Sequence, residues 1–188
     1  MKRIFSMSDG KARVRESSGG VYYINSSFER ISDDYTDGFE YESQGSFARV
    51  QLENGTWGII DWKGNLVFEG ADSIQPLPLV TLYGSAVIEG KACLFELGFE
   101  TGEEIKIIKK FDEFCGISEV YLGVFATVID RTGMTGVIDW KGNIVIPAQY
   151  KTIEYDFVYN EDSVWIGDDI VFTCYEEDGT VEKIEKKW

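Results

Sequence analysis

The chain has 188 residues, of which 44% are hydrophobic, so it can bury a core of its own and fold as an ordinary globular protein. Its 33 acidic residues outnumber its 18 basic residues and give a formal net charge of −15. Such a surface repels nucleic acid and anionic membranes, because binding to phosphate requires cationic side chains, and a basic protein is the partner that it attracts.

The apolar runs of the sequence are short. Even PLPLVTLYGSAVI at 76–88 is interrupted by Pro and Gly, and it falls below the roughly 18 residues that a membrane span needs. The N-terminal stretch holds too few apolar residues before Ser8 and Asp9 to form a signal-peptide core. We therefore expect no segment that spans a membrane, and a cytoplasmic location.

The predicted elements recur in chain order. A first hairpin is expected at 12–25, where ARVRESSGGVYYIN places two strand-forming stretches around a Ser-Gly-Gly turn. The second copy, FARVQLENGTWGIIDWKGNLV at 47–67, returns as FATVIDRTGMTGVIDWKGNIV at 125–145 with twelve of twenty-one positions identical, which indicates a repeated structural unit. A degenerate copy lies between them at 85–114, and a last one, DIVFTCYEEDGTVEKI, lies at 169–184.

Each copy has the pattern of antiparallel β structure. FARVQL alternates, GTWGIID is an apolar stretch bounded by glycine, and the Lys-Gly-Asn that follows accepts the positive φ of a tight turn. We expect an all-β single domain over 1–188, with about five degenerate antiparallel β-hairpin repeats in a twisted solenoid or a propeller-like array. The units are expected near 11–43, 47–80, 84–116, 124–160 and 163–188.

Two of these units resemble the WG-repeat family. The residues that carry the resemblance are GTWGIIDWKGNLV at 55–67 and GMTGVIDWKGNIVIPAQY at 133–150, the second of which has Thr135 where the family has its Trp. The resemblance implies a β-hairpin repeat that serves as a scaffold or interaction surface, generally without catalysis, and it implies no particular ligand.

The sequence indicates no catalytic residue, no metal site and no cofactor. It has no histidine, so the usual Ser or Cys relay is missing, and Cys93, Cys115 and Cys174 are expected to be reduced and buried. Asp61 and Asp139 recur within the repeat, so we expect them to accept backbone N–H bonds in turns rather than act as catalytic carboxylates.

Three tryptophans of the repeats have two interpretations. Trp57, Trp62 and Trp140 are expected to pack in the core or between repeats. Stacking against a sugar is the alternative for an exposed one.

Two windows combine acids with aromatic residues and contain no Lys or Arg, namely DDYTDGFEYE at 33–42 and EYDFVYNEDSVWIGDD at 154–169. Protein interfaces use aromatic anchors within a charged rim, whereas a solvated surface requires only the charges. Each window follows the same point of its unit, so we expect both on one rim of the array. The predicted partner-binding residues are Asp33, Asp34, Tyr35, Asp37, Glu40, Glu42, Tyr155, Asp156, Tyr159, Glu161, Asp162 and Trp165.

These observations predict a non-catalytic module that binds a basic protein. The most concrete form is an immunity protein, or antitoxin, that captures and blocks a basic bacterial toxin such as a nuclease. A generic WG-repeat structural or adaptor scaffold is one alternative, and a carbohydrate-binding or carbohydrate-active protein is another.

Overall fold

All regular elements of the protein are β-strands in the computed structural model, which describes residues 3–5, 7, 9–43, 45–78, 81–98, 105–159 and 165–188, with the backbone alone at 159 and 165–168. The strands form five antiparallel sheets, three of four strands and two of three. This confirms the all-β prediction. Among the described residues, no helix is long and apolar enough to cross a membrane.

Within each sheet the strands lie in chain order. The first sheet contains β1 (Arg3–Ile4), β2 (Lys11–Arg15) and β3 (Val21–Asn25), and the second contains β4 (Asp37–Gly38), β5 (Phe47–Gln51), β6 (Trp57–Asp61) and β7 (Leu66–Ala71). The third contains β8 (Ser73–Ile74), β9 (Tyr83–Ile88), β10 (Lys91–Glu96) and β11 (Lys106–Lys110). The fourth contains β12 (Phe114–Ile117), β13 (Phe125–Asp130), β14 (Thr135–Asp139) and β15 (Ile144–Tyr150), and the fifth contains β16 (Thr152–Tyr159), β17 (Trp165–Tyr175) and β18 (Val181–Lys187).

Each sheet begins one strand earlier than the unit seen in the sequence. The hairpins β5–β6 and β13–β14 are the repeated cores of the two best copies, and their registers match, with Phe47 opposite Asp61 and Phe125 opposite Asp139. The last residues of each unit instead form the first strand of the next sheet, as β8 does by pairing with β9. The chain passes directly from one sheet to the next: one residue separates β7 from β8 and β15 from β16, and three residues separate β11 from β12.

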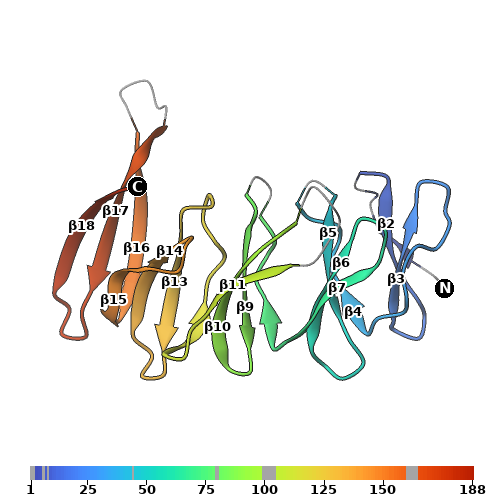
Figure 1. Ribbon diagram of the computed structural model, residues 1–188, viewed down its shortest axis with the longest axis horizontal. Helices are drawn as coiled ribbons and strands as arrows, with labels where there is room; N and C mark the ends of the chain where they lie inside the picture. The colour runs from blue at the N-terminus through green and yellow to red at the C-terminus, as the bar shows by residue number, and fades with distance from the viewer. Residues whose placement is uncertain are drawn as a thin grey trace.

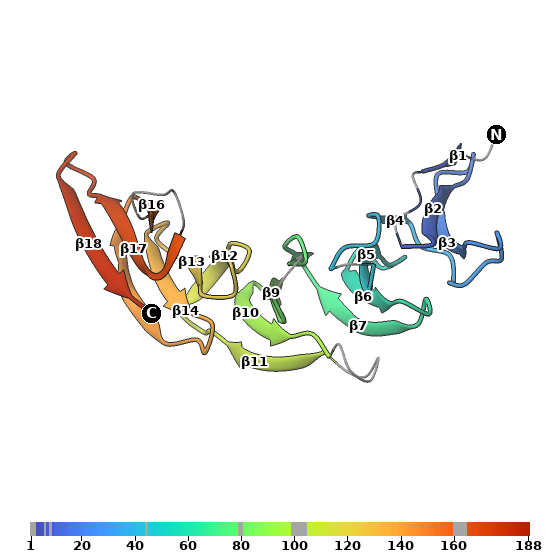
Figure 2. The same ribbon diagram turned by 90° about the horizontal axis from the view of Figure 1, so that it is seen from above.

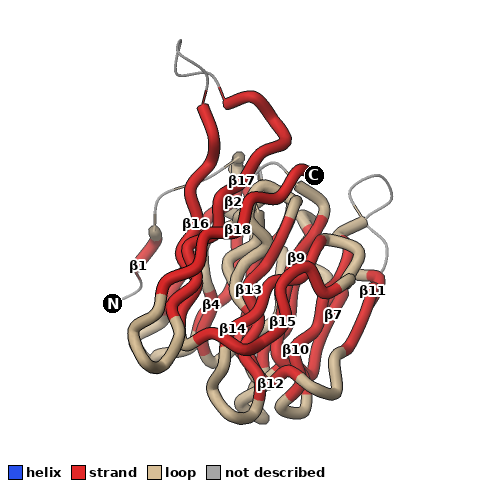
Figure 3. The backbone as a smooth tube through the Cα atoms, turned by 90° about the vertical axis from the view of Figure 1, so that its left-hand side faces the viewer, coloured by secondary structure: helices blue, strands red, loops and turns tan. Residues whose placement is uncertain are grey.

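The five sheets stand side by side in a row, with the two ends of the chain at opposite ends of that row (Figure 1). Seen from above, the row bends into an arc, with β4, β12 and β16 on its concave side and β7 and β11 on its convex side (Figure 2). Figure 3 looks along the row, so that the sheets lie one behind another. The first strands of the second, fourth and fifth sheets therefore lie on the inside of the arc.

The buried core lies between neighbouring sheets. Between the second and third sheets, Phe47 and Ile59 pack against Ala86 and Phe95, and the other junctions have clusters of the same kind. A sheet of three or four strands cannot bury both of its faces alone, so each sheet depends on its neighbours, as in other repeat arrays.

The two DWKGN turns have the structural role predicted for them. Asp61 Oδ1 accepts the N–H groups of Lys63 and Asn65 at 2.9 and 2.8 Å, and Asp139 repeats this pattern with its own turn. Gly64 and Gly142 have φ of +87° and +82°, which confirms the positive φ expected of them. Each turn also packs on the preceding sheet, since the place of a Cβ on Gly64 lies 1.9 Å from the carbonyl oxygen of Ile31.

Candidate interaction surface

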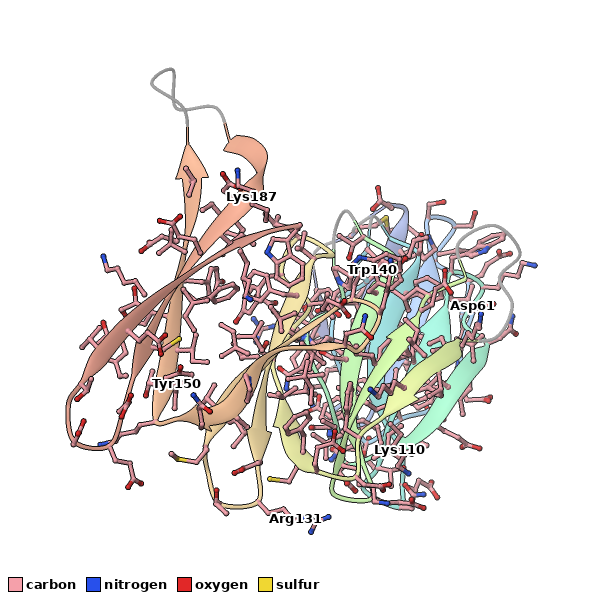
Figure 4. The ribbon with its side chains drawn as sticks, turned by 60° about the vertical axis from the view of Figure 1, so that its left-hand side comes forward. Asp61, Lys110, Arg131, Trp140, Tyr150 and Lys187 are labelled. Carbon is pink, nitrogen blue, oxygen red and sulfur yellow. The ribbon has the colours of Figure 1, made fainter. Side chains whose placement is uncertain are left out.

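In the second, third and fourth sheets, the connection from the first to the second strand lies along one long side of the row, here called the upper rim. It comprises residues 39–43, 45–46, 75–78, 81–82 and 118–124, and in Figure 1 it lies at the top. The DWKGN turns lie on the same side of the row as the upper rim. Asp61 and Trp140 of these turns therefore lie high in Figure 4, whereas Lys110 and Arg131 lie low.

The aromatic residues of the first window belong largely to the core. Tyr35 and Tyr41 are each 6% exposed, and the Tyr41 hydroxyl donates to the carbonyl oxygen of Asp61 at 2.9 Å. Tyr41 also meets Tyr23 of the first sheet edge to face, with 5.3 Å between ring centroids. Burial, and then the nearby Asp33 carboxylate, raises the pKa of Tyr35 to about 12. These two tyrosines join the first and second sheets and offer little surface to a partner.

The acids of the first window are mostly paired with arginines of the protein itself. Four acids have such partners, and the pairs are Asp34 with Arg30, Asp37 with Arg15, Glu40 with Arg13, and Glu42 with Arg49. Among the described residues Asp33 has no ion-pair partner, and it is exposed. Much of the negative charge that the sequence places here is therefore compensated, and two of the pairs connect the first sheet to the second.

The second window alternates along β16, which separates its acids from its aromatic residues. Tyr155 and Phe157 face the core between the fourth and fifth sheets, together with Ile153 and Phe172. Asp156 is exposed and lies on the opposite face of the strand. The interleaving of acids and aromatics is thus the two-residue period of a strand with one buried face.

The remaining predicted residues of that window lie partly outside the described residues. This applies to Glu161 and Asp162 entirely, and to the side chains of Tyr159 and Trp165, whose backbones pair across β16 and β17. The structure therefore brings Tyr155 and Asp156 into one strand but on opposite faces. The two windows belong to the second and fifth sheets, with two sheets between them.

The tryptophans of the two DWKGN turns differ in their surroundings. Trp140 stacks on Tyr83 of the preceding sheet, with 4.9 Å between ring centroids. Trp62 is 51% exposed, and the Lys63 ammonium lies 5.0 Å from its ring. The packing role expected of these tryptophans applies to Trp140, and Trp62 presents an open aromatic face.

The upper rim contains a cavity of about 560 Å³ that sequence reasoning missed. Its walls are residues 76–78 and Thr81 of the third sheet, residues 119–122 of the fourth sheet, and Tyr155 and Phe157 of the fifth. Three segments far apart in the sequence form it. The only sequence signal for the cavity is the segment SEVYLG at 118–123, which precedes the repeated FATVID and contains an acid and a tyrosine.

The cavity is lined by one carboxylate and by aromatic rings. The rings of Tyr121 and Tyr155 lie 4.7 Å apart between centroids. Burial raises the pKa of Tyr155 to about 12, and the Tyr121 hydroxyl and the Glu119 carboxylate act in the same direction. None of the lining residues is Lys or Arg. Elsewhere, the described residues contain no group of His, Cys, Asp and Glu arranged to hold a metal ion.

Stability at low pH should depend on Asp37. Burial alone would raise its pKa, but hydrogen bonds from the Gly38 N–H and the Arg15 guanidinium hold the pKa below the ordinary value. Because the pKa of Asp37 is lower in the folded state than in the unfolded state, its ionised carboxylate stabilises the fold above about pH 4. This stabilisation is lost as the pH falls through the pKa of the folded state. We expect Asp37→Asn to melt at a lower temperature than the parent at pH 6, and the difference to shrink toward pH 2.5.

The matched control is Asp33→Asn, which removes an exposed acid of the same window. Thermal melts of the three proteins from pH 2.5 to 6 provide the measurement. Identical pH profiles for Asp37→Asn and the parent would contradict a structural role for the Asp37–Arg15 pair.

The protein is similar to known proteins in its structure but not in its sequence. The sequence matches no protein-family model, and no curated protein matches it significantly. Among solved structures, the chain is similar to BamB from Moraxella catarrhalis, with a TM-score of 0.45 and 13% identity over 98% of this chain and 58% of that chain. It is also similar to the C-terminal WD40 domain of Sif2, with a TM-score of 0.46 and 10% identity over 95% of this chain and 55% of that chain. The chain thus spans little more than half the length of either structure.

Proposed function

We propose that this protein is a non-catalytic module that captures a basic protein partner. The observation that carries the proposal is the net charge of −15, set by 18 basic and 33 acidic residues. Seven ion pairs join described residues, so part of the small basic complement is already neutralised internally. A partner that approaches the protein therefore meets mainly unpaired carboxylates, which attract a cationic surface.

The most concrete form of the proposal is an immunity protein that blocks a basic toxin, such as a nuclease. An acidic surface can imitate the phosphates that such an enzyme binds, and so occupy its substrate cleft. The array is proposed to be propeller-like, since the first strands of three of its sheets lie on the inside of an arc (Figure 2). Its repeats are proposed to be of the WG type. Both features suit a rigid surface that presents connections from several sheets at one rim.

A carbohydrate-binding protein is the second candidate, favoured by one observation. Trp62 is 51% exposed on a rigid turn, and an exposed aromatic face is where a sugar ring stacks. Saturable quenching of tryptophan fluorescence by oligosaccharides, lost in Trp62→Ala, would support this candidate over the first.

The proposed function is tested by co-purification from the native host at low salt, identification of the partner by mass spectrometry, and reconstitution from purified components. We expect a basic partner whose association rate constant falls at least about tenfold as ionic strength rises from about 0.01 to about 0.15 M, because the Debye length shrinks from about 30 to about 8 Å. For an immunity protein, co-expression should also restore the growth of cells that produce the partner. A partner that is acidic, or that binds at a rate insensitive to salt, would contradict the proposal.

Charge reversal at exposed acids should slow this capture. We expect Asp33→Lys and Asp156→Lys to lower the association rate constant and leave the melting temperature within about 1 °C, since both side chains are exposed and make no ion pair with described residues. Glu69→Lys, an exposed acid of β7 on the convex side of the arc, is the control (Figure 2). Equal rates for all three variants would remove Asp33 and Asp156 from the contact surface.

A further inference from the structure

The protein places its own arginines in one recurring environment. Three guanidinium groups each lie over an aromatic ring, at 4.0 to 4.8 Å from the ring centroid, while pairing with a carboxylate. These groups are Arg13 over Phe5 with Glu40, Arg30 over Tyr22 with Asp34, and Arg49 over Phe39 with Glu42. Ring face and carboxylate together recognise a delocalised cation, because the π-electrons and the negative charge attract it from two sides.

The cavity at the upper rim has the same ring and carboxylate components without a cation. Glu119 makes no ion pair with any described residue, and no Lys or Arg of the described residues lies over Tyr121 or Tyr155. The Glu119 carboxylate is close enough to Tyr155 to raise the pKa of its hydroxyl. The negative charge of Glu119 is thus not neutralised by a cationic side chain of the described residues.

The walls of the cavity suit the apolar stem of a long cationic side chain. Leu77 lies between two prolines, whose rings restrict the loop, and Leu122 is 47% exposed at φ +49°, a strained conformation for leucine. Thr81 also lines the cavity, and its Oγ1 is buried without a hydrogen-bond partner among the described residues. Long basic side chains bury their methylene groups on such surfaces and keep the charged head at a polar end.

The cavity is held open by contacts between sheets. The Ser85 hydroxyl donates to the carbonyl oxygen of Ser118 at 2.5 Å, and Gly123 packs so closely on Thr81 that a Cβ there would lie 2.7 Å from its Cγ2. Glu42 accepts the Leu77 N–H at 3.2 Å from the side of the second sheet. The walls are therefore positioned before any partner arrives, which lowers the entropic cost of binding.

We propose that this cavity receives an arginine side chain presented by the basic partner protein. Its guanidinium would lie against the contacting rings of Tyr121 and Tyr155 on one side and face the Glu119 carboxylate on the other. The inference rests on the proposed function and deepens it, because it specifies where one residue of the partner is anchored. Charge complementarity favours this occupant: the lining holds a carboxylate and no cation, in a protein of net charge −15.

The test uses acetyl-glycyl-arginyl-glycine amide as the probe and its citrulline analogue, which has the same shape without the charge. Binding to the full chain is followed by the NMR chemical shifts of the Leu77 and Leu122 methyl groups. We expect saturable shifts with a dissociation constant about tenfold lower for the arginine peptide, and a loss of that preference in Glu119→Gln. Glu69→Gln on the convex side is the matched control and should behave like the parent, and thermal melts should show all variants folded.

Three outcomes of the peptide experiment would overturn the inference. Equal affinity for the arginine and citrulline peptides would make the cavity a plain apolar groove. Binding of tetramethylammonium there, with exclusion of the arginine peptide, would make it a small-molecule site. The absence of shifts at Leu77 and Leu122 would exclude binding.

Capture of the whole partner separates the inference from the proposed function. If Glu119→Gln leaves salt-sensitive capture unchanged, the arginine anchor is wrong and the proposed function still stands. If capture by the parent protein is insensitive to salt, the proposed function itself is contradicted.

Discussion

Gly64→Ala is expected to be strongly destabilising, lowering the free energy of unfolding by about 2 to 6 kcal/mol. Two costs add at this position. The backbone has φ of +87°, which an alanine adopts only with strain, and the new Cβ would lie 1.9 Å from the carbonyl oxygen of Ile31. That oxygen is backbone, so the turn and the connection between the first two sheets must move apart. Urea denaturation measures the loss.

Gly55→Ala is the matched control for this prediction. Gly55 has φ of +85°, and nothing lies within 4 Å of a Cβ built there, so it has the strain without the clash. We expect it to cost about 1 to 2 kcal/mol. Gly142→Ala should fall between the two, since its Cβ would meet the flexible side chain of Lys109 at 2.8 Å. Equal losses at Gly64 and Gly55 would show that the turn does not hold the first two sheets together.

Glu42→Ala is expected to destabilise the protein by about 3 kcal/mol, because it leaves the Arg49 guanidinium buried without its charge partner. The side chains of Arg49 and Glu42 are 9% and 21% exposed, and the pair is bidentate, at 2.9 and 2.7 Å. Arg49 also donates to the carbonyl oxygen of Ile74 at 2.9 Å, so the pair ties the second sheet to the third. Denaturant unfolding monitored by tryptophan fluorescence measures the change.

Two further variants separate this effect from a general effect of charge. Asp34→Ala removes the partner of Arg30, but the side chains of that pair are 44% and 68% exposed, so we expect a loss below about 1 kcal/mol. The double variant Glu42→Ala with Arg49→Met should recover part of the stability, because no unpaired charge remains buried. If Glu42→Ala and Asp34→Ala cost the same, the Glu42–Arg49 pair does not act as a link between sheets.

These two results also affect how binding experiments are designed. Glu42 was predicted from the sequence to contact a partner, yet the structure makes it part of a junction between sheets. A variant at Glu42 that loses binding would report unfolding as readily as lost contact. Asp33 and Asp156 are exposed and lack ion pairs with described residues, so they are the better probes of the surface.

The sequence by itself determined the local structure of the repeats. The alternation in FARVQL and FATVID, and the Asp and Gly of DWKGN, are sufficient to predict β5–β6, β13–β14 and the turns that follow them, because strand pairing and Asx-turns depend on residues close in the chain. The positive φ at Gly64 and Gly142 was predictable for the same reason.

The tertiary structure alone decided which acids are paired and where the cavity of the upper rim lies. The arginines that neutralise Asp37, Glu40 and Glu42 come from other strands, and no spacing in the sequence shows those pairs. The sequence predicts one surface for the acids and aromatics of β16, whereas the pleat of the strand sends Tyr155 and Asp156 to opposite faces. The cavity bounded by Leu77, Glu119 and Tyr155 depends on how three sheets stack, since side-chain packing between distant segments follows from the curvature of the whole array rather than from any local pattern.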